Sequence, residues 1–454
     1  MAISSANNQA PKRGNEARPF RFLDTVHWPL TILVGVLFYM AAPYVLNWST
    51  TIYKIGFGLE GGEDFQLLQV VQEGSTGRRL AMLALLALGL DALLRRNKYF
   101  RLRGMHAHML VLYVVLATMS MMWAEDPGLT ARKIIILWCM FAGAAGVASR
   151  LSLRGIVSMT VVLTGATLLL SLGAEIALGS FRPWSGSYRF SGIMHPVSQG
   201  WTCGLLFLSA FSLALCNARP RHMLWLLAFA GLAGILLTRS RWPLVTCMAG
   251  TVVVLHFAGS LRSKALIVLW LGVLGGVLLL IMLDSPGEGM MQLATMGRGE
   301  TAAQELGTFT GRLGLWKELL ALWAERPVLG YGYNAFQIPS IINYLEMVMA
   351  WIPANSHCGY IQTLLGLGVA GLATFVLLLA FSLARAWSLA RKRTLNCFLA
   401  AVLVWLGVNL LLETALVTEP FLPTFIVYVV IVRLCLFSPR EELETAEENK
   451  GVSA

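Results

Sequence analysis

A histidine stands at the start of a long apolar run in the stretch PANSHCGYIQTLLGLGVAG, which covers residues 353–371. The Pro, Asn and Ser just before it are typical of a helix start, so we expect His357 in the first turn of the following helix. Unpaired backbone N–H groups and the helix dipole at that position disfavour a charged imidazole and attract anions. A neutral imidazole can accept a proton, so His357 is a candidate general base for a hydroxyl group. The alternative is a polar histidine that only caps the helix.

Two arginines lie close together in TRSRW, residues 238–242, between apolar runs that leave almost no loop between them. Arg239 and Arg241 could form a paired clamp for a phosphate group, because guanidinium groups bind phosphate oxygens in bidentate fashion and stay charged. The alternative is that both side chains only extend from helix ends to the polar edge of a membrane.

A third polar stretch, RFSGIMHPVSQG at residues 189–200, leads through a glycine-containing turn into an apolar run. Arg189 is a further candidate for binding phosphate. His195 precedes a proline, and we interpret it as a polar residue at a helix start rather than as a catalyst.

A separate helix is predicted in TGRLGLWKELLALWAERP, residues 310–327. Thr310 suits its N-cap, Pro327 ends it, and Arg312 lies at its start. Apolar residues recur at i, i+3, i+4 and i+7: Trp316, Leu319, Leu320 and Trp323. We expect this stripe to hold the helix in a membrane interface with its tryptophans toward the lipid.

None of the polar stretches has a pattern that holds a metal ion or a nucleotide. The sequence between apolar runs contains no Asp-x-Asp pair, no His and carboxylate set at metal spacing and no glycine-rich phosphate loop with lysine. The seven cysteines follow neither metal-ligand nor disulfide spacing. We therefore expect no metal and no cofactor, and a leaving group whose developing charge is stabilised by arginines.

The elements that must position these residues are membrane helices. Of the 454 residues, 57% are hydrophobic and 13% charged, which is more apolar surface than a water-soluble domain can bury. Twelve apolar runs are long enough to cross a bilayer, near residues 29–46, 79–95, 105–123, 133–149, 155–178, 198–217, 222–238, 242–259, 264–283, 358–381, 395–413 and 420–437. We predict an all-α integral membrane protein with about twelve transmembrane helices.

The positive charges predict how these helices are oriented. Most of the 35 Lys and Arg residues fall in the two termini and in alternate loops, which places both termini in the cytoplasm. The net charge of +11 is then a topology signal rather than a sign of nucleic-acid binding. Arg239 and Arg241 fall on the outward side, against this charge bias, so we favour the phosphate clamp for them.

The predicted topology divides the chain into five parts. Residues 1–21 and 439–454 are expected to be disordered cytoplasmic tails, 22–283 to hold nine spans and 358–438 the last three. Residues 284–357 form one large periplasmic loop with interfacial helices, and a loop of this length is usually functional.

Several stretches together resemble the O-antigen ligase and polymerase superfamily of bacterial inner membranes. They are TGRLGLWKELLALWAERPVLGYGYNAF, ANSHCGYIQTLLGLGVAG, WAEDPGLTARK, RFSGIMHPVSQG and TRSRWPL. The resemblance runs from about residue 105 to 375 and implies that His357 is catalytic and that Arg312, Arg239 and Arg241 engage a lipid-linked donor. We therefore predict His357 and Arg312 as catalytic residues, and Arg239, Arg241 and Arg189 as the residues that bind the donor pyrophosphate.

The resemblance implies a metal-independent, inverting glycosyltransferase. The donor would be O-antigen polysaccharide on undecaprenyl pyrophosphate, and the acceptor a hydroxyl of lipid A-core, at the periplasmic side of the inner membrane. An O-antigen polymerase of the same superfamily stays open. Polymerases often carry an arginine followed eleven positions later by glycine in two periplasmic loops, whereas this chain has it once, from Arg189 to Gly200.

A transporter of lipid-linked glycans is the alternative from a different class. Charged residues within the predicted spans are few, and Asp91, Glu175 and Glu413 lie near span ends, which counts against a proton relay across the bilayer.

Overall fold

The computed structural model describes residues 20–41, 76–95, 102–185, 188–216, 218–259, 264–269, 271–272, 276, 312–349, 353, 355–414 and 420–436. Several predicted features lie outside the described residues. They are Thr310, the loop before Arg312, most of the predicted span near 264–283, the N-terminal tail up to Pro19 and the chain from Phe437 onward.

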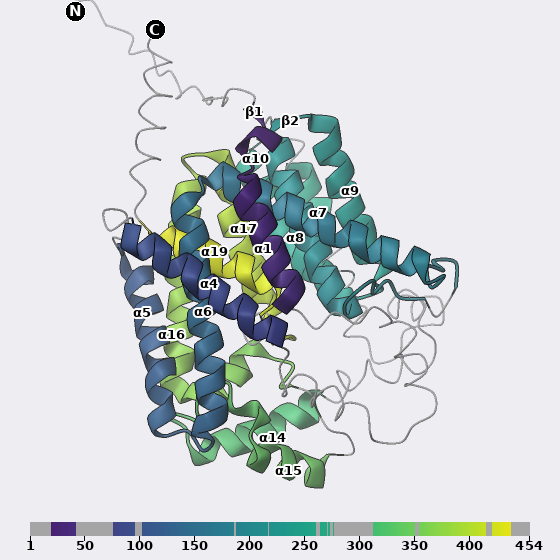
Figure 1. Ribbon diagram of the computed structural model, residues 1–454. Coiled ribbons are helices and arrows are strands. Elements are labelled where there is room, and N and C mark those ends of the chain that lie inside the picture. The colour runs from purple at the N-terminus through teal and green to yellow at the C-terminus, as the bar shows by residue number, and fades with distance from the viewer. Residues whose placement is uncertain are drawn as a thin grey trace, which may run out of the picture.

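The chain is an all-α membrane protein (Figure 1). Its helices are α1 (Trp28–Ala41), α4 (Thr76–Arg95), α5 (Met105–Met119), α6 (Pro127–Arg150), α7 (Leu153–Ala177), α8 (Pro196–Leu215), α9 (Arg221–Leu237), α10 (Arg241–Ala258), α14 (Arg312–Glu325), α15 (Pro339–Val348), α16 (Gly359–Ala390), α17 (Cys397–Asn409) and α19 (Leu422–Cys435). Short 3₁₀ helices lie at Leu23–Thr25, Ser120–Met122, Ala335–Gln337 and Thr394–Asn396.

Six helical segments within the described residues are long and apolar enough to cross a membrane: Met105–Met122, α6, α7, α8, α10 and α16. Four shorter apolar helices, Trp28–Ala41, Arg221–Leu237, Thr394–Asn409 and Leu422–Cys435, coincide with further predicted spans. The membrane class is confirmed, and the count of twelve spans stays a prediction.

Local sequence signals explain where several helices begin. Asp126 accepts a hydrogen bond from the Leu129 N–H at 2.9 Å just before the Pro that opens α6, and Ser152 caps α7. The His195 side chain accepts from the Val197 N–H at 3.3 Å at the start of α8. His195 is therefore a helix-start residue, as the sequence indicates.

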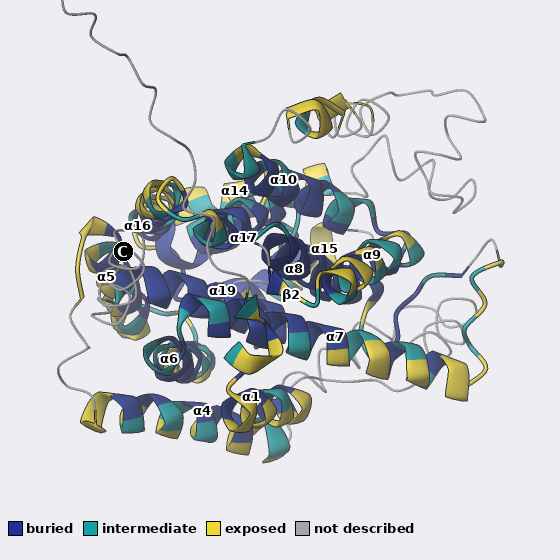
Figure 2. Ribbon diagram, turned by 90° about the horizontal axis from the view of Figure 1, so that it is seen from above, coloured by how far each residue is buried: buried dark blue, intermediate teal, exposed yellow. Residues whose placement is uncertain are grey.

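Helix α8 forms the centre of the bundle, and it packs against α7, α9 and α10 (Figure 2). Nearly all of its residues are buried, and small side chains allow close helix contacts. A Cβ atom added to Gly231 of α9 would lie 2.8 Å from the Cys203 carbonyl oxygen of α8. The short helices α17 and α19 fill the rest of this core.

The described part of the molecule has two distinct ends. At one end, strand β1 (Phe20–Arg21) pairs in parallel with β2 (Ala218–Arg219), and Leu102 bridges to Leu436. Phe20 and Arg21, expected in the disordered tail, are thus ordered in the described structure. Helices α14 and α15 lie at the opposite end (Figure 1).

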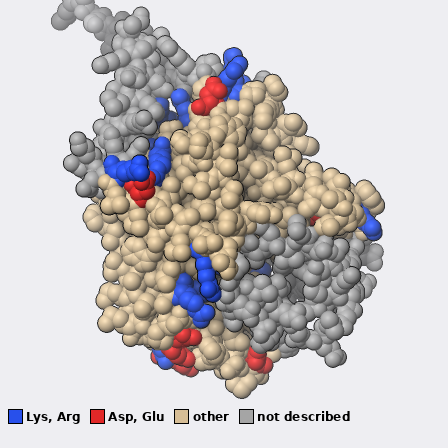
Figure 3. All heavy atoms as spheres, in the orientation of Figure 1, with Lys and Arg blue, Asp and Glu red and all other residues tan. Residues whose placement is uncertain are grey.

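The two ends of the described structure differ in their charged contacts. Between the charged groups, wide parts of the surface visible in Figure 3 belong to uncharged residues. At the end with α14 and α15, Arg326 pairs with Glu125 at 3.4 Å and Lys133 donates to Gln337 at 3.0 Å. These contacts fix the large predicted loop to the loop before α6 and to α6 itself.

Helix α16 is broken at Gly368, whose φ of 64° and ψ of −165° are not helical. Val369 and Ala370 donate to the carbonyls of Pro327 and Val328 at 2.9 and 3.3 Å. In the other direction, Tyr331 and Gly332 donate to the carbonyls of Leu365 and Gly366 at 3.0 and 2.8 Å. Segment 327–332 therefore satisfies the backbone groups that the break releases.

The break changes which part of α16 needs to cross the membrane. As one straight helix, its 32 residues would be about 48 Å long, against about 30 Å of hydrocarbon. The part after Gly368 is long enough to cross by itself. The span predicted at 358–381 begins within one residue of α16, and the break at Gly368 inside it was not predicted, because apolarity alone does not reveal a backbone break.

Candidate functional site

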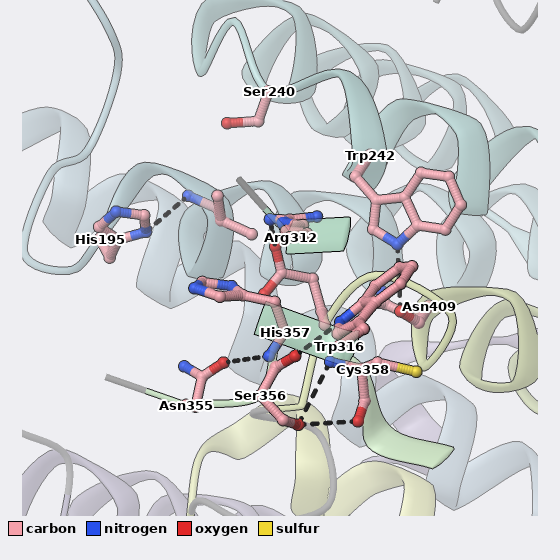
Figure 4. Close-up of polar contacts among 12 residues, drawn as sticks. His195, Ser240, Trp242, Arg312, Trp316, Asn355, Ser356, His357, Cys358 and Asn409 are labelled. Carbon is pink, nitrogen blue, oxygen red and sulfur yellow. Dashed lines mark hydrogen bonds and ion pairs between the residues drawn. The ribbon is translucent and has the colours of Figure 1, made fainter. Parts of the chain in front are cut away.

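His357 lies just outside the helix that the sequence predicts it to open. Helix α16 begins at Gly359 with Cys358 at its N-cap, and His357 has a left-handed backbone with φ of 48°. The Asn355 side chain accepts from the His357 N–H at 2.9 Å, and the Ser356 hydroxyl donates to the Cys358 carbonyl at 2.9 Å (Figure 4). The prediction of a first-turn histidine is wrong, because Asn355 and Ser356 build a turn before the helix instead of capping it.

Burial and nearby positive charge keep the His357 imidazole neutral. Desolvation, followed by Arg312 and His195, lowers the pKa of His357 to about 3. In Figure 4 the ring lies below Arg312 and points to the side on which His195 lies. The His357 imidazole is neutral, as expected. The causes are burial and the charge of Arg312, whereas the sequence argument relied on the helix dipole.

Helix α14 brings Arg312 to the same place. Arg312 Nη2 lies 3.3 Å from Glu413 Oε1, and both side chains are largely buried. One turn along the helix, the Trp316 indole N–H donates at 2.9 Å to the carbonyl of Ser356, the neighbour of His357. Two contacts therefore fix the start of α14 against the histidine turn.

The buried face of α14 differs from the predicted one. Leu315 and Leu319 are fully buried against α15 and α16, whereas Leu320 is 40% exposed and Trp316 and Trp323 are half-buried. The prediction that this stripe faces the lipid is therefore wrong for Leu319. Leu315 and Leu319, an i, i+4 pair, pack on protein instead, because α15 and the start of α16 cover that side of α14.

Arg189 connects its own stretch to the arginine turn. Its Nε donates to the Thr238 carbonyl at 3.3 Å and its Nη2 to the Ser240 hydroxyl at 3.1 Å. Arg239, with a left-handed φ of 48°, donates from Nη2 to the Ser185 carbonyl at 3.1 Å, and Arg241 opens α10. The two stretches form one unit at the start of α10.

His195 links the arginine unit to His357. The His195 side chain is exposed at the surface of the isolated chain, but desolvation by the surrounding protein, and then Arg189, lower its pKa to about 4. His195 in turn acts on His357. Trp242 donates to the Asn409 carbonyl at 3.1 Å and also joins α10 to the end of α17 (Figure 4). The structure thus gathers polar residues from four separate stretches at one end of the bundle.

Sequence reasoning assigned no role to Glu413, which pairs with Arg312. Burial raises the pKa of Glu413 to about 7, although the Arg312 guanidinium acts in the opposite direction. The sequence does contain a signal for such a role, because a carboxylate at the end of an apolar run needs a polar or charged partner. The sequence could not show that this partner is Arg312, because Arg312 lies 101 positions away in the chain.

Comparison with known proteins bears on the same segment. Residues 226–376 match the family model described as O-antigen ligase. This match supports the O-antigen ligase superfamily over about a third of the chain. The matched O-antigen ligase segment contains Arg239, Arg241, Arg312 and His357, whereas Arg189 precedes it. No curated protein matches the chain.

The matched family is one of glycosyltransferase-like membrane enzymes. The roles of the four arginines and of His357 stay predictions. Within the described ranges, no group of three His, Cys, Asp or Glu side chains could hold a metal ion. That the candidate site works without metal or cofactor remains a prediction from the sequence.

Proposed function

We propose that this enzyme is an O-antigen ligase that transfers O-antigen polysaccharide from undecaprenyl pyrophosphate to a hydroxyl of lipid A-core. The observation that carries the proposal is the half-buried His357 turn, held by Asn355 and by Trp316 of the helix that carries Arg312. The low pKa of His357, caused by desolvation and then by Arg312 and His195, supports it. Such a site combines a proton acceptor for the acceptor hydroxyl with cations for the donor pyrophosphate.

In the proposed reaction, the acceptor hydroxyl transfers its proton to the His357 imidazole as its oxygen attacks the anomeric carbon of the donor sugar. The bond from that carbon to the phosphate oxygen breaks, and undecaprenyl pyrophosphate leaves with its negative charge. Arg312, Arg239, Arg241 and Arg189 stabilise this charge. Both substrates are held in one membrane, which supplies proximity, and the donor bond supplies the energy.

The low pKa of His357 makes its basicity depend on the donor. With a pKa of about 3 the imidazole is a weak base in the free enzyme. The negative charges of a bound pyrophosphate would offset Arg312 and raise that pKa toward neutrality. Proton acceptance would therefore become favourable when the donor is in place.

We assign the end with α14 and α15 to the periplasm of a bacterial inner membrane, with both termini in the cytoplasm. The positive-inside bias supports this orientation, because the end with β1 and β2 carries the loops rich in Lys and Arg. The twelve-span topology, with residues 284–357 as the large periplasmic loop, belongs to the same proposal.

The decisive experiment offers the purified protein either donor with lipid A-core or donor alone. Capped lipopolysaccharide in the first mixture supports ligation. A lengthened donor chain in the second would instead identify a polymerase, and movement of the donor across the bilayer without transfer would identify a transporter. EDTA should leave ligation unchanged, and activity restored by Mg²⁺ would contradict the metal-free mechanism.

Variants connect ligation to the site. His357→Ala and Arg312→Ala should each lower kcat by about 100-fold or more, as expected for loss of proton transfer or of charge stabilisation. His108→Ala is the matched control, because His108 is exposed at the other end of the bundle. Turnover near the wild-type rate in His357→Ala would exclude His357 from the reaction.

A further inference from the structure

Glu175 is a buried carboxylate to which the proposed reaction gives no role. It lies in the last turn of α7 with 1% of its surface exposed. Its Oε1 accepts from the Ser191 and Gly192 N–H groups at 2.9 and 2.8 Å, and its Oε2 accepts from the Tyr188 hydroxyl at 2.5 Å. A buried carboxylate is costly unless it is hydrogen-bonded, so these donors and the carboxylate depend on each other.

All three donors belong to the loop that carries Arg189. Tyr188 precedes the arginine, while Ser191 and Gly192 follow it by two and three positions. The burial of Tyr188 and its contact with Glu175 raise the pKa of the Tyr188 hydroxyl, which keeps it protonated as a donor. One carboxylate therefore holds the backbone on both sides of Arg189.

The same loop is pressed onto its neighbours by close backbone contacts. Phe190 donates to the Leu237 carbonyl at 2.9 Å, just before the arginine turn. Gly192 has a φ of 62°, and a Cβ atom added to it would lie 2.2 Å from the Ser171 Cβ of α7. This approach is possible only for glycine, and it brings the Gly192 N–H to Glu175.

Arg189 also contacts the turn that carries Arg239 and Arg241. Its guanidinium donates to the Thr238 carbonyl and to the Ser240 hydroxyl, the residues on either side of Arg239. The polar contacts thus run from Glu175 through the 188–192 loop and Arg189 to the start of α10.

We propose that Glu175 is a positioning residue for the arginines that receive the donor pyrophosphate: its carboxylate fixes the 188–192 loop, and the loop fixes Arg189 against the 238–241 turn. The inference rests on the proposed function. Glu175 acts through Arg189 and does not touch the donor.

A double-mutant cycle separates positioning from general stability. Glu175→Ala should lower kcat/KM for the donor by about 100-fold, which a misplacement of about 1 Å can cost. Combined with Arg189→Ala, it should add almost nothing to the loss in Arg189→Ala alone, because both changes break one chain of contacts. Glu175→Gln keeps one carbonyl acceptor for the two backbone N–H groups, so its loss should lie between those of wild type and Glu175→Ala.

Thr164→Val is the matched control, because Thr164 is a buried polar residue of α7 whose hydroxyl bonds within its own helix. It should leave kcat/KM unchanged. Wild-type kcat/KM in Glu175→Ala, or losses that multiply in the double variant, would overturn the inference.

Hydrogen–deuterium exchange tests the inference independently of transfer. Glu175→Ala, or Glu175→Gln if the alanine variant does not fold, should speed exchange in 188–192 and 238–241 and leave α16 unchanged. Unchanged exchange in both segments would overturn the positioning role. If the wild-type protein shows no transfer at all, the proposed function fails, while the exchange result still decides whether Glu175 orders these loops.

Discussion

At the scale of single residues, His357 combines an unusual backbone with an unusual electrostatic environment. A left-handed φ in a non-glycine residue costs free energy and persists where the surroundings fix it, here through Asn355 and the Trp316 contact to Ser356. The same surroundings lower the pKa of His357 by burial and by Arg312. Strain and desolvation at one side chain are typical of functional sites.

Glu413 predicts a pH dependence of donor binding. Its pKa of about 7 means that below pH 7 the carboxyl is protonated and Arg312 keeps its full charge for the pyrophosphate, whereas above pH 7 the carboxylate neutralises it. Glu413→Gln should bind undecaprenyl pyrophosphate roughly fivefold more tightly than wild type at pH 8, the effect of about 1 kcal/mol, and equally at pH 6. The measurement is the ratio of the dissociation constants of wild type and Glu413→Gln at each pH, because titration of the ligand affects both constants equally. A ratio that stays constant from pH 6 to 8 would contradict the role of Glu413.

Arg239 predicts that geometry matters beyond charge. Arg239→Lys keeps the positive charge but loses the planar fork that can bind two phosphate oxygens while donating to Ser185. We expect kcat/KM for the donor to fall roughly tenfold. Arg132→Lys, an exposed arginine that bonds within the first turns of α6, is the control and should match wild type. Full activity in Arg239→Lys would reduce the clamp to a simple charge.

At the scale of elements, the break in α16 determines where the histidine turn lies. The helical segment before Gly368 leads back to His357, and segment 327–332, which fills the break, follows the C-terminal end of α14. The break and the Trp316 contact to Ser356 therefore hold α14 against the start of α16 at two places.

Gly368→Ala should therefore destabilise the protein and impair the site. The left-handed backbone costs about 1 to 3 kcal/mol in a residue with a Cβ atom, and that atom would lie 2.2 Å from the Val328 carbonyl. We expect a lower midpoint of thermal unfolding in detergent and reduced transfer. Gly173→Ala is the matched control, because nothing lies within 4 Å of its added Cβ atom. Equal midpoints for the two variants would show that the break is not required.

At the scale of the whole molecule, the candidate site lies at the end of an apolar bundle opposite to strands β1 and β2. The end with β1 and β2 includes Arg150 paired with Asp91, and Arg433 bonded to the Ala148 carbonyl. The other end holds the candidate site with α14 and α15. This polarity suits an enzyme that takes lipid-held substrates at one surface of a membrane.

Cysteine labelling tests the orientation. Met347→Cys, at a position that is 78% exposed on α15, should react with a membrane-impermeant maleimide applied from the periplasm, and Lys392→Cys at the other end should not. The background should be low, because six of the seven native cysteines are buried and Cys216 is half-buried at the end with β2. Labelling of Lys392→Cys alone would invert the proposed topology.

The sequence by itself determined the membrane class, the approximate helix positions and the stretches that hold the candidate site. Apolar run length, loop charge and polar residues at helix starts are local properties, because the transfer free energy of a segment depends on its own side chains. His195 at the start of α8 and the helix at Arg312 followed directly from such signals.

Only the tertiary structure decided how these pieces act on one another. The left-handed turn of His357, the break at Gly368 and the pairing of Arg312 with Glu413 each depend on segments far apart in the chain. In the sequence, Glu175 is only a charged residue near a span end. Its hydrogen-bond donors can be identified only from the structure, in which the 188–192 loop folds back onto α7. Burial and partner choice arise when helices pack, so no local pattern could specify them.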